Sequence, residues 1–216
     1  VIGKLCDTWG PRKTYTALLV LCAFPVMLIG LSNSYISFLL FRLAIGVIGA
    51  SFVLTQYHTS VMFATNIKGT ANAVAGGWGN TGGGATQIMM PLIAAGMVAM
   101  GWVSKEDSWR LAMVIPGVLL LVMAFLYYRY TKDTPAGNFE DLPKVPGQKR
   151  ENTFLLAAKD YRTWVLTIAY AACFGVEITV DNYAASFFHD DYKASLIMAG
   201  LLASIFGWLN VFARAM

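Results

Sequence analysis

The chain has 216 residues, of which 57% are hydrophobic and 13% charged, and its mean hydropathy is +0.57. This composition excludes an ordinary soluble fold and predicts an all-α membrane protein, because apolar runs of about 20 residues are typical of helices that cross a bilayer. The net charge of +4 indicates no nucleic-acid partner, since an excess of Lys and Arg in cytoplasmic loops explains it.

Charge-poor runs predict six membrane spans, at about residues 14–32, 35–63, 69–100, 109–130, 162–187 and from 194 onward. The connections on one side of the spans hold eleven Lys and Arg residues, and those on the other side hold three. We therefore expect the first set to lie in the cytoplasm and the protein to be a multi-pass protein of the cytoplasmic membrane. The chain starts abruptly, and we expect it to be a fragment at both ends.

The third predicted span has a centre rich in glycine. It carries no charge between Lys68 and Lys105. On a helix of 3.6 residues per turn, one face combines three glycines with two amides: Gly76, Asn80, Gly83, Gly84 and Gln87. Missing side chains let a neighbouring backbone approach closely or leave room for a solute. We expect this face to pack closely or to bind something small.

A polar segment follows the fourth predicted span. Residues 131–160 contain three prolines, charges of both signs and no apolar periodicity, and so predict a cytoplasmic linker. We expect the linker to divide the chain into residues 1–130 and residues 161–216.

Other motifs indicate no further chemistry. The three cysteines (Cys6, Cys22 and Cys173) are far apart and predict neither a disulfide nor a metal site. A G-x-G-x-x-G match at residues 77–82 lies inside a membrane-length run with no strand before it, so it does not indicate a dinucleotide fold. We expect no metal, no cofactor and no enzymatic activity.

Two patterns resemble the major facilitator superfamily. Gly3-x-x-x-Asp7-x-x-Gly10-Pro11-Arg12-Lys13 resembles the loop after helix 2 of that superfamily, and Arg42-x-x-x-Gly46-x-x-x-Ala50 resembles its helix 4. The resemblance implies part of its helical bundle, from the end of helix 2 to helix 8, or about six of twelve membrane helices. Residues 131–160 would then be the central loop between two six-helix halves. A turn and charge network is implied at the cytoplasmic face, formed by Gly3, Asp7, Gly10 and Arg12.

The glycine-rich span narrows the resemblance. Residues 75–87 are similar to the nitrate signature of the nitrate/nitrite porter family, and Phe52-Val53-x-x-Gln56-Tyr57, Gly175-Val176-Glu177 and Phe212-Ala213-Arg214 resemble segments of that family in the same order. This resemblance implies a secondary active transporter of nitrate or nitrite that works by alternating access. We expect proton-coupled nitrate uptake by a monomer; the alternatives are nitrate/nitrite antiport, a carrier for another small anion, and a nitrate sensor.

The same resemblance implies a binding site for a flat anion. Arg214 would bind it through the planar guanidinium, although an Arg near a helix end can also extend to the membrane interface. Phe52 and Phe174 would sandwich the anion, and Tyr170 and Asn80 would add polar contacts beside Gly76. Because ring faces are partly negative, the rings would supply shape, and the guanidinium and amide donors would supply attraction.

Charges inside spans need a reason, because each costs about 2.5 to 3.5 kcal/mol at a helix centre on insertion scales. Glu177 and Asp181 are four residues apart on one helix face, where close carboxylates tend to share a proton, as proton coupling requires. The alternative places Asp181 at the water boundary near His189. Arg42 either pairs with an acid elsewhere or, by the superfamily resemblance, takes part in proton coupling.

Overall fold

The computed structural model describes residues 2–142 and 153–215, and the side chains of residues 2–142 and 155–213. Helices joined by loops and turns make up this part of the chain. Their bounds, in chain order, are α1 (Ile2–Trp9), α2 (Pro11–Leu28), η1 (Ile29–Leu31), α3 (Tyr35–Gly46), η2 (Val47–Gly49), α4 (Ala50–Met62), α5 (Lys68–Ala99), α6 (Ser108–Ala112), α7 (Val114–Tyr130), α8 (Thr153–Lys159), α9 (Tyr161–Asp190) and α10 (Leu196–Ala215).

The six predicted membrane spans are confirmed. Among the described residues, six helical stretches are long and apolar enough to cross a bilayer: Pro11–Leu31, Tyr35–Met62, Lys68–Ala99, Ser108–Tyr130, Tyr161–Asp190 and Leu196–Ala213. The predicted all-α fold class is confirmed with them.

Two spans are less regular than the sequence predicts. The second span tightens into the 3₁₀ turn η2 between α3 and α4, with Gly46 before the turn and Gly49 at its end. The fourth span is interrupted at Met113, between α6 and α7. Pro116 has no N–H to donate to the carbonyl of Ala112, and this missing bond accounts for the interruption.

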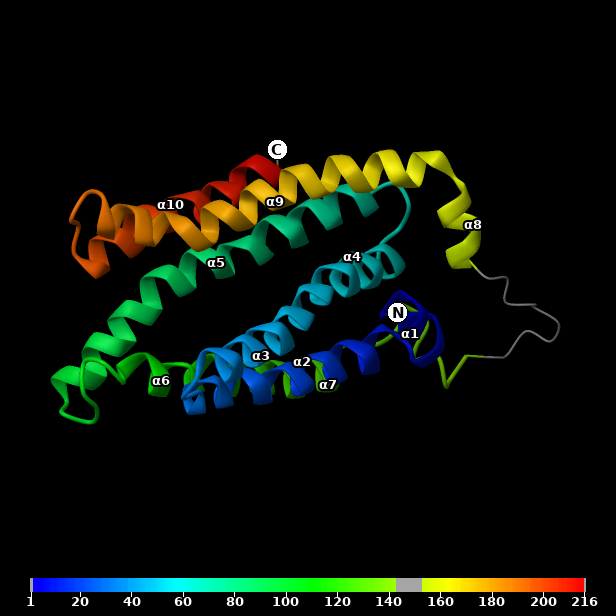
Figure 1. The fold of residues 1–216 in the computed structure, drawn as a ribbon. Helices are drawn as coiled ribbons and strands as arrows, with labels where there is room; N and C mark the ends of the chain where they lie inside the picture. The colour runs from blue at the N-terminus through cyan, green and yellow to red at the C-terminus, as the bar shows by residue number, and fades with distance from the viewer. Residues whose placement is uncertain (1, 143–152, 216) are drawn as a thin grey trace.

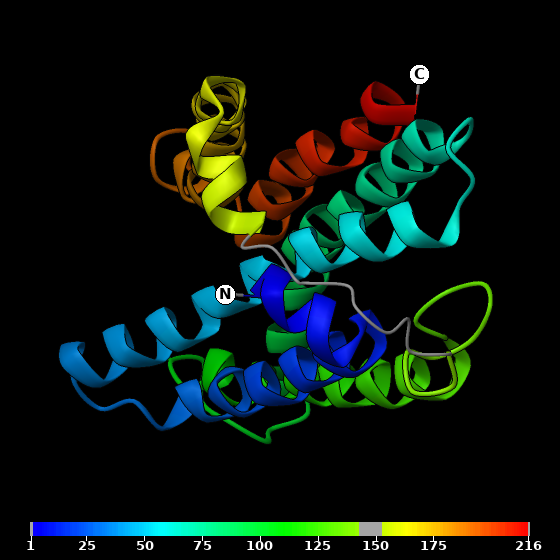
Figure 2. The same cartoon turned by 90° about the vertical axis from the view of Figure 1, so that its right-hand side faces the viewer.

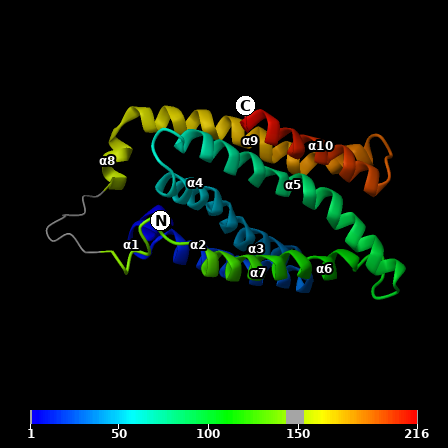
Figure 3. The ribbon, with the colours of Figure 1, turned by 180° about the vertical axis from the view of Figure 1, so that it is seen from behind.

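The helices form two layers (Figure 1). In one layer, α2 packs on α7, and α3 and α6 lie beside them; in the other, α9 packs on α10. The long helix α5 runs obliquely between the layers and packs on α10 and α4, as the view from behind in Figure 3 also shows. The turned view in Figure 2 places α4 next to the start of α5. The more basic connections, including those at α1 and α8, lie at one end of the molecule.

Helices α5 and α10 meet backbone to backbone. A Cβ atom added to Gly207 would lie 2.7 Å from the backbone nitrogen of Gly84, and one added to Gly84 would lie 2.9 Å from the carbonyl oxygen of Ser204. One turn further along α5, and two turns back along α10, a Cβ on Gly200 would overlap the carbonyl of Gln87. The close approach expected of the glycine face is therefore present, and its partner is α10.

The segment after α7 folds back onto the start of α2. Residues 131–142 form turns, and the predicted linker also contains the short helix α8, where a locally apolar sequence interrupts the polar composition of the segment as a whole. Residues 143–152 lie outside the described part of the chain. Because α5 packs on α10, helices from both sides of the linker contact each other.

Candidate functional site

A stripe of predicted site residues runs along α9. Tyr170, Phe174, Glu177 and Asp181 are spaced by four, three and four residues and so share one helix face. On α5 the amides Asn80 and Gln87 lie seven residues apart, on the glycine face that the sequence analysis identified. The two stripes meet, because hydrogen bonds join them at two levels.

Glu177 is a hydrogen-bond acceptor shared by two amides. Asn80 of α5 and Asn210 of α10 both donate an N–H from Nδ2 to its Oε1, the second at 3.1 Å. The three residues are partly buried, between helices from both sides of the linker. One carboxyl oxygen of Glu177 thus gathers N–H donors from two different helices.

One turn further along α9, Asp181 lies against the glycine face. Its backbone carbonyl accepts an N–H from Gln87 Nε2 at 2.9 Å. A Cβ on Gly83 would lie 3.6 Å from its Oδ2, so the glycine leaves room for this carboxyl group. Asp181 Oδ1 and Gln87 Oε1 are buried and accept no hydrogen bond from the described residues. Asp181 precedes the end of α9 by nine residues, or about 14 Å of helix, which places it away from His189 in the last turn.

Three aromatic rings stack beside this polar cluster. The ring of Phe52 on α4 lies 5.8 Å from that of Tyr170 and 6.4 Å from that of Phe174 between centroids, at interplanar angles of 23° and 28°. Tyr170 and Phe174 lie 5.3 Å apart at 16°. A flat ion between two rings needs about 7 Å, which is two carbon contact distances of about 3.5 Å. At 6.4 Å, the centroids of Phe52 and Phe174 are slightly closer than this, so an ion would fit between the rings only if α4 and α9 stood slightly further apart.

The remaining predicted site residues are placed less completely. Arg214 lies on the last turn of α10, and its side chain is outside the described residues. It follows Asn210 by four residues and so shares its helix face. Gly76 is buried one turn before Asn80. Arg42 is exposed on α3 and forms no ion pair with a described residue.

The cytoplasmic loop motif forms a tight turn. Gly10 adopts φ = 87°, a conformation that favours glycine, and a Cβ there would overlap the carboxylate of Asp133. Asp7 accepts a hydrogen bond from Tyr57 Oη at 3.1 Å, and Arg12 Nε donates to the carbonyl of Tyr128 at 2.8 Å. Gly3 lies within α1 with open space around it, not in the turn.

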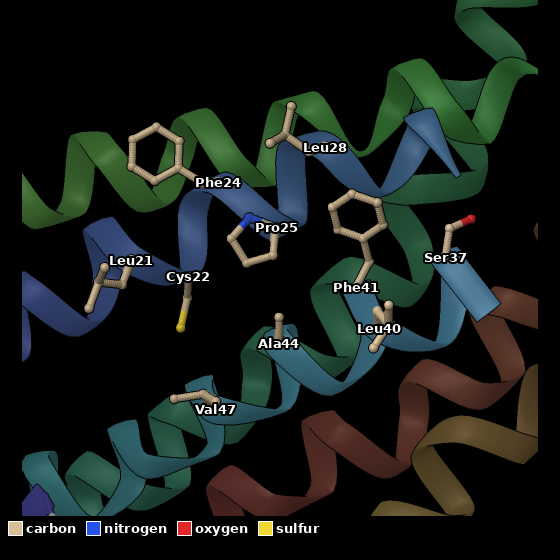
Figure 4. Close-up of a pocket in the computed structure, with 10 residues that line it drawn as sticks. All are labelled: Leu21, Cys22, Phe24, Pro25, Leu28, Ser37, Leu40, Phe41, Ala44 and Val47. Atoms are coloured by element: carbon tan, nitrogen blue, oxygen red, sulfur yellow. The ribbon is translucent and has the colours of Figure 1, made fainter. Parts of the chain in front are cut away.

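A separate hollow lies between α2 and α3 (Figure 4). Its volume is about 580 Å³, and its lining is apolar apart from one hydroxyl: Leu21, Cys22, Phe24, Pro25, Leu28, Ser37, Leu40, Phe41, Ala44 and Val47. That hydroxyl donates to the carbonyl of Ser34. With no cationic or amide donor in its wall, the hollow does not suit an anion, and the amide and aromatic cluster remains the candidate site.

Sequence analysis missed Asn210, which completes the cluster. Its sequence context could have identified it as a site residue: it is a lone amide within an apolar run, and a polar group in a membrane span needs a partner. The packing face of α10 was also detectable, since Gly200, Ser204 and Gly207 recur at helical spacing as a stripe of small residues.

Together, the six spans and the polar groups held between them define a multi-pass integral membrane protein with a hydrogen-bonded cluster between its helices. The Major Facilitator Superfamily profile matches residues 1–216, and the chain belongs to this transporter superfamily as part of its helical bundle.

Curated relatives carry transporter names. The chain is 38% identical over 217 residues to the high affinity nitrate transporter 2.5 of Arabidopsis thaliana, covering 99% of this chain and 43% of that protein. It is 37% identical over 219 residues to the nitrate transporter 2.2 of Chlamydomonas reinhardtii, covering 99% and 42%. Against the nitrate/nitrite transporter NrtP of Nostoc punctiforme the identity is 22% over 286 residues, covering 99% and 57%. The chain thus spans less than half of the first two relatives. No solved structure matches it.

Proposed function

We propose that this chain is part of a secondary active transporter of nitrate or nitrite in the cytoplasmic membrane, and that its main activity is proton-coupled nitrate uptake. The observation that carries the proposal is the convergence of the glycine-rich helix with a stack of aromatic rings. Asn80 of α5 lies beside the stripe of α9 that bears Tyr170 and Phe174, and Phe52 of α4 faces those rings. The names of the relatives support the choice of anion.

The proposed site recognises shape and charge with different groups. With a slightly wider separation, the near-parallel rings of Phe52 and Phe174 would form a slot that suits a planar or bent anion and rejects a tetrahedral one. The amide of Asn80 and the guanidinium of Arg214 supply donors, and a guanidinium is a planar fork that meets two oxygens of nitrate at once. The small residue at Gly76 keeps the adjoining turn of α5 free of side-chain bulk.

Transport would follow alternating access, in which two halves move about a central site. Asn80 and Phe52 precede the linker, whereas Tyr170, Phe174 and Arg214 follow it, so the site lies between the two proposed halves. Glu177 and Asp181 are the proposed proton carriers, since they are carboxyl groups within a membrane span beside the anion site. Arg42 remains a third candidate for coupling. A carrier of this kind performs no chemical reaction, so we propose no enzymatic activity.

Uptake of labelled nitrate tests the proposal. The native-length protein is reconstituted in proteoliposomes and assayed with and without an inward proton gradient, alongside Arg214→Lys and the control Arg129→Lys at the exposed end of α7. We expect uptake only with the gradient, loss of uptake in Arg214→Lys, and no loss in the control. Uptake that requires internal nitrite instead of the gradient would make the protein an antiporter. No nitrate uptake under either condition would contradict the assignment.

A further inference from the structure

We propose that Asn80 and Asn210 exchange one acceptor for another during transport: they bind the Glu177 carboxylate in the empty site and bind the anion once Glu177 has taken up a proton. This inference rests on the proposed function. It adds Asn210 as an anion ligand and makes Glu177 the group that links proton binding to anion binding.

The hydrogen bonds of the cluster support the first part of the proposal, in which both amides bind Glu177. Asn80 and Asn210 approach the same oxygen of Glu177 from two different helices. Each amide nitrogen has two N–H donors, whereas an ionised carboxylate offers only acceptors. The described arrangement therefore places donors from two helices on one carboxyl oxygen, and an anionic substrate requires the same kind of donors.

The position of the cluster supports the second part of the proposal, in which the same amides bind the anion. Glu177 follows Phe174 by three residues and shares its helix face, so the carboxylate lies next to the aromatic slot. Asn210 precedes Arg214 by four residues on α10 and shares its face. Asn210 therefore connects Glu177 with the face of α10 to which Arg214 belongs.

Competition between the negative charge of Glu177 and that of the anion couples proton binding to anion binding. An ionised Glu177 repels an anion in the slot and also holds the donors that the anion needs. Protonation removes the repulsion and weakens the carboxyl group as an acceptor, so the amides turn to the anion. The cluster carries one negative charge before the exchange, on Glu177, and one after it, on the anion. Because coupling is reciprocal, anion binding must favour protonation to the same extent.

Few other ionisable groups face Glu177. Asp181 lies one turn further along α9, and Tyr170 lies two turns before it. Helix α5 has no ionisable residue after Lys68, and on α10 the ionisable residue is Arg214. On α4, Tyr57 is bonded to Asp7, and His58 is bonded to Tyr127 and the carbonyl of Lys132, so neither is directed at this cluster.

Proton uptake on anion binding tests the exchange. The purified native-length protein is held in weakly buffered solution at pH 7.5 with a pH indicator, and nitrate, nitrite, formate and chloride are added in separate titrations. We expect about one proton taken up for each nitrate bound. Glu177→Gln should bind nitrate without proton uptake and with an affinity independent of pH. Asn210→Ala should weaken binding about tenfold, the effect of losing about 1.4 kcal/mol of hydrogen bonding.

Asn182→Ala is the matched control, because Asn182 is an exposed residue of α9 whose amide donates to the carbonyl of Ile178. It should behave as the unmodified protein does. Proton uptake that persists in Glu177→Gln, or equal affinities in Asn210→Ala and Asn182→Ala, would overturn the exchange while nitrate transport still stood. If formate or chloride caused Glu177-dependent proton uptake and nitrate did not, the result would support the exchange and contradict the proposed substrate. If none of the four anions binds, both proposals are wrong.

Discussion

Asp133 accepts the backbone N–H of Arg12 at 2.8 Å, across 121 residues of sequence. Its other carboxylate oxygen accepts the N–H of Phe139 at 3.1 Å, and only 2% of the residue is exposed. Arg12 is the second residue of α2, so the carboxylate caps the positive end of that helix dipole. A loop after the fourth span thus closes the turn that precedes the first.

We expect Asp133→Ala to lower the stability of the protein by about 1 to 3 kcal/mol, because it leaves buried N–H groups without an acceptor. Thermal unfolding and hydrogen exchange at the Arg12 amide measure the effect. Glu140→Ala is the control in the same loop, since the ion pair of Glu140 with Lys13 is exposed to solvent. Equal stability of the two variants would show that the cap contributes nothing.

The crossing of α5 and α10 gives a second prediction. Gly207→Ala places a methyl group against the backbone of Gly84 and should destabilise the protein by about 1 to 3 kcal/mol, the usual cost of overpacking. Gly82→Ala has open space around its new methyl group and should be neutral or slightly stabilising. Thermal aggregation of both variants in detergent compares them directly. A Gly207→Ala variant as stable as Gly82→Ala would mean that the helices do not cross this closely.

The aromatic slot gives a third prediction, about selectivity. Phe52→Ala removes one wall of the slot, so we expect the KM for nitrate to rise about tenfold or more and the preference for nitrate over chloride to fall. Competition of unlabelled anions against labelled nitrate measures both. Val53→Ala, at the exposed neighbouring position, should leave them unchanged. If Phe52→Ala weakened nitrate and chloride equally, the ring would not act through shape.

Thiol labelling gives a fourth prediction. Burial and the nearby Asp7 carboxylate raise the pKa of Cys6 from its ordinary value of 9.0 to about 11. Since a raised pKa keeps the thiol protonated, the reactive thiolate at pH 8 should be about a hundredfold scarcer than for an exposed cysteine. In a Cys6→Ala background, Thr8→Cys on the same helix supplies that comparison. Maleimide labelling of Cys6 at the rate of Thr8→Cys would contradict the buried position.

The membrane spans could be predicted from the sequence because the bilayer alone sets the length and hydropathy that a spanning helix needs. The neighbouring helices do not change these requirements. The same reasoning missed the interruption near Met113, although Pro116 marks it. It also missed the burial of Asp133, which lies in a polar segment and becomes buried only when the loop folds back. The glycine face of α5 was evident from spacing, but its partner was not, because the residues that meet it on α10 lie more than 100 positions further on.

The contact between Gly84 and Gly207 has a mechanical consequence. Two backbones in contact leave no gap for the helices to move closer, and the ring of Trp208 packs beside them against Gly84. A second backbone contact, between Gly200 and Gln87, holds the same two helices together further along α10. The two contacts together fix both the distance and the angle between α5 and α10. Asn210 lies one turn beyond the first contact, so this fixed crossing also holds its amide within reach of Glu177.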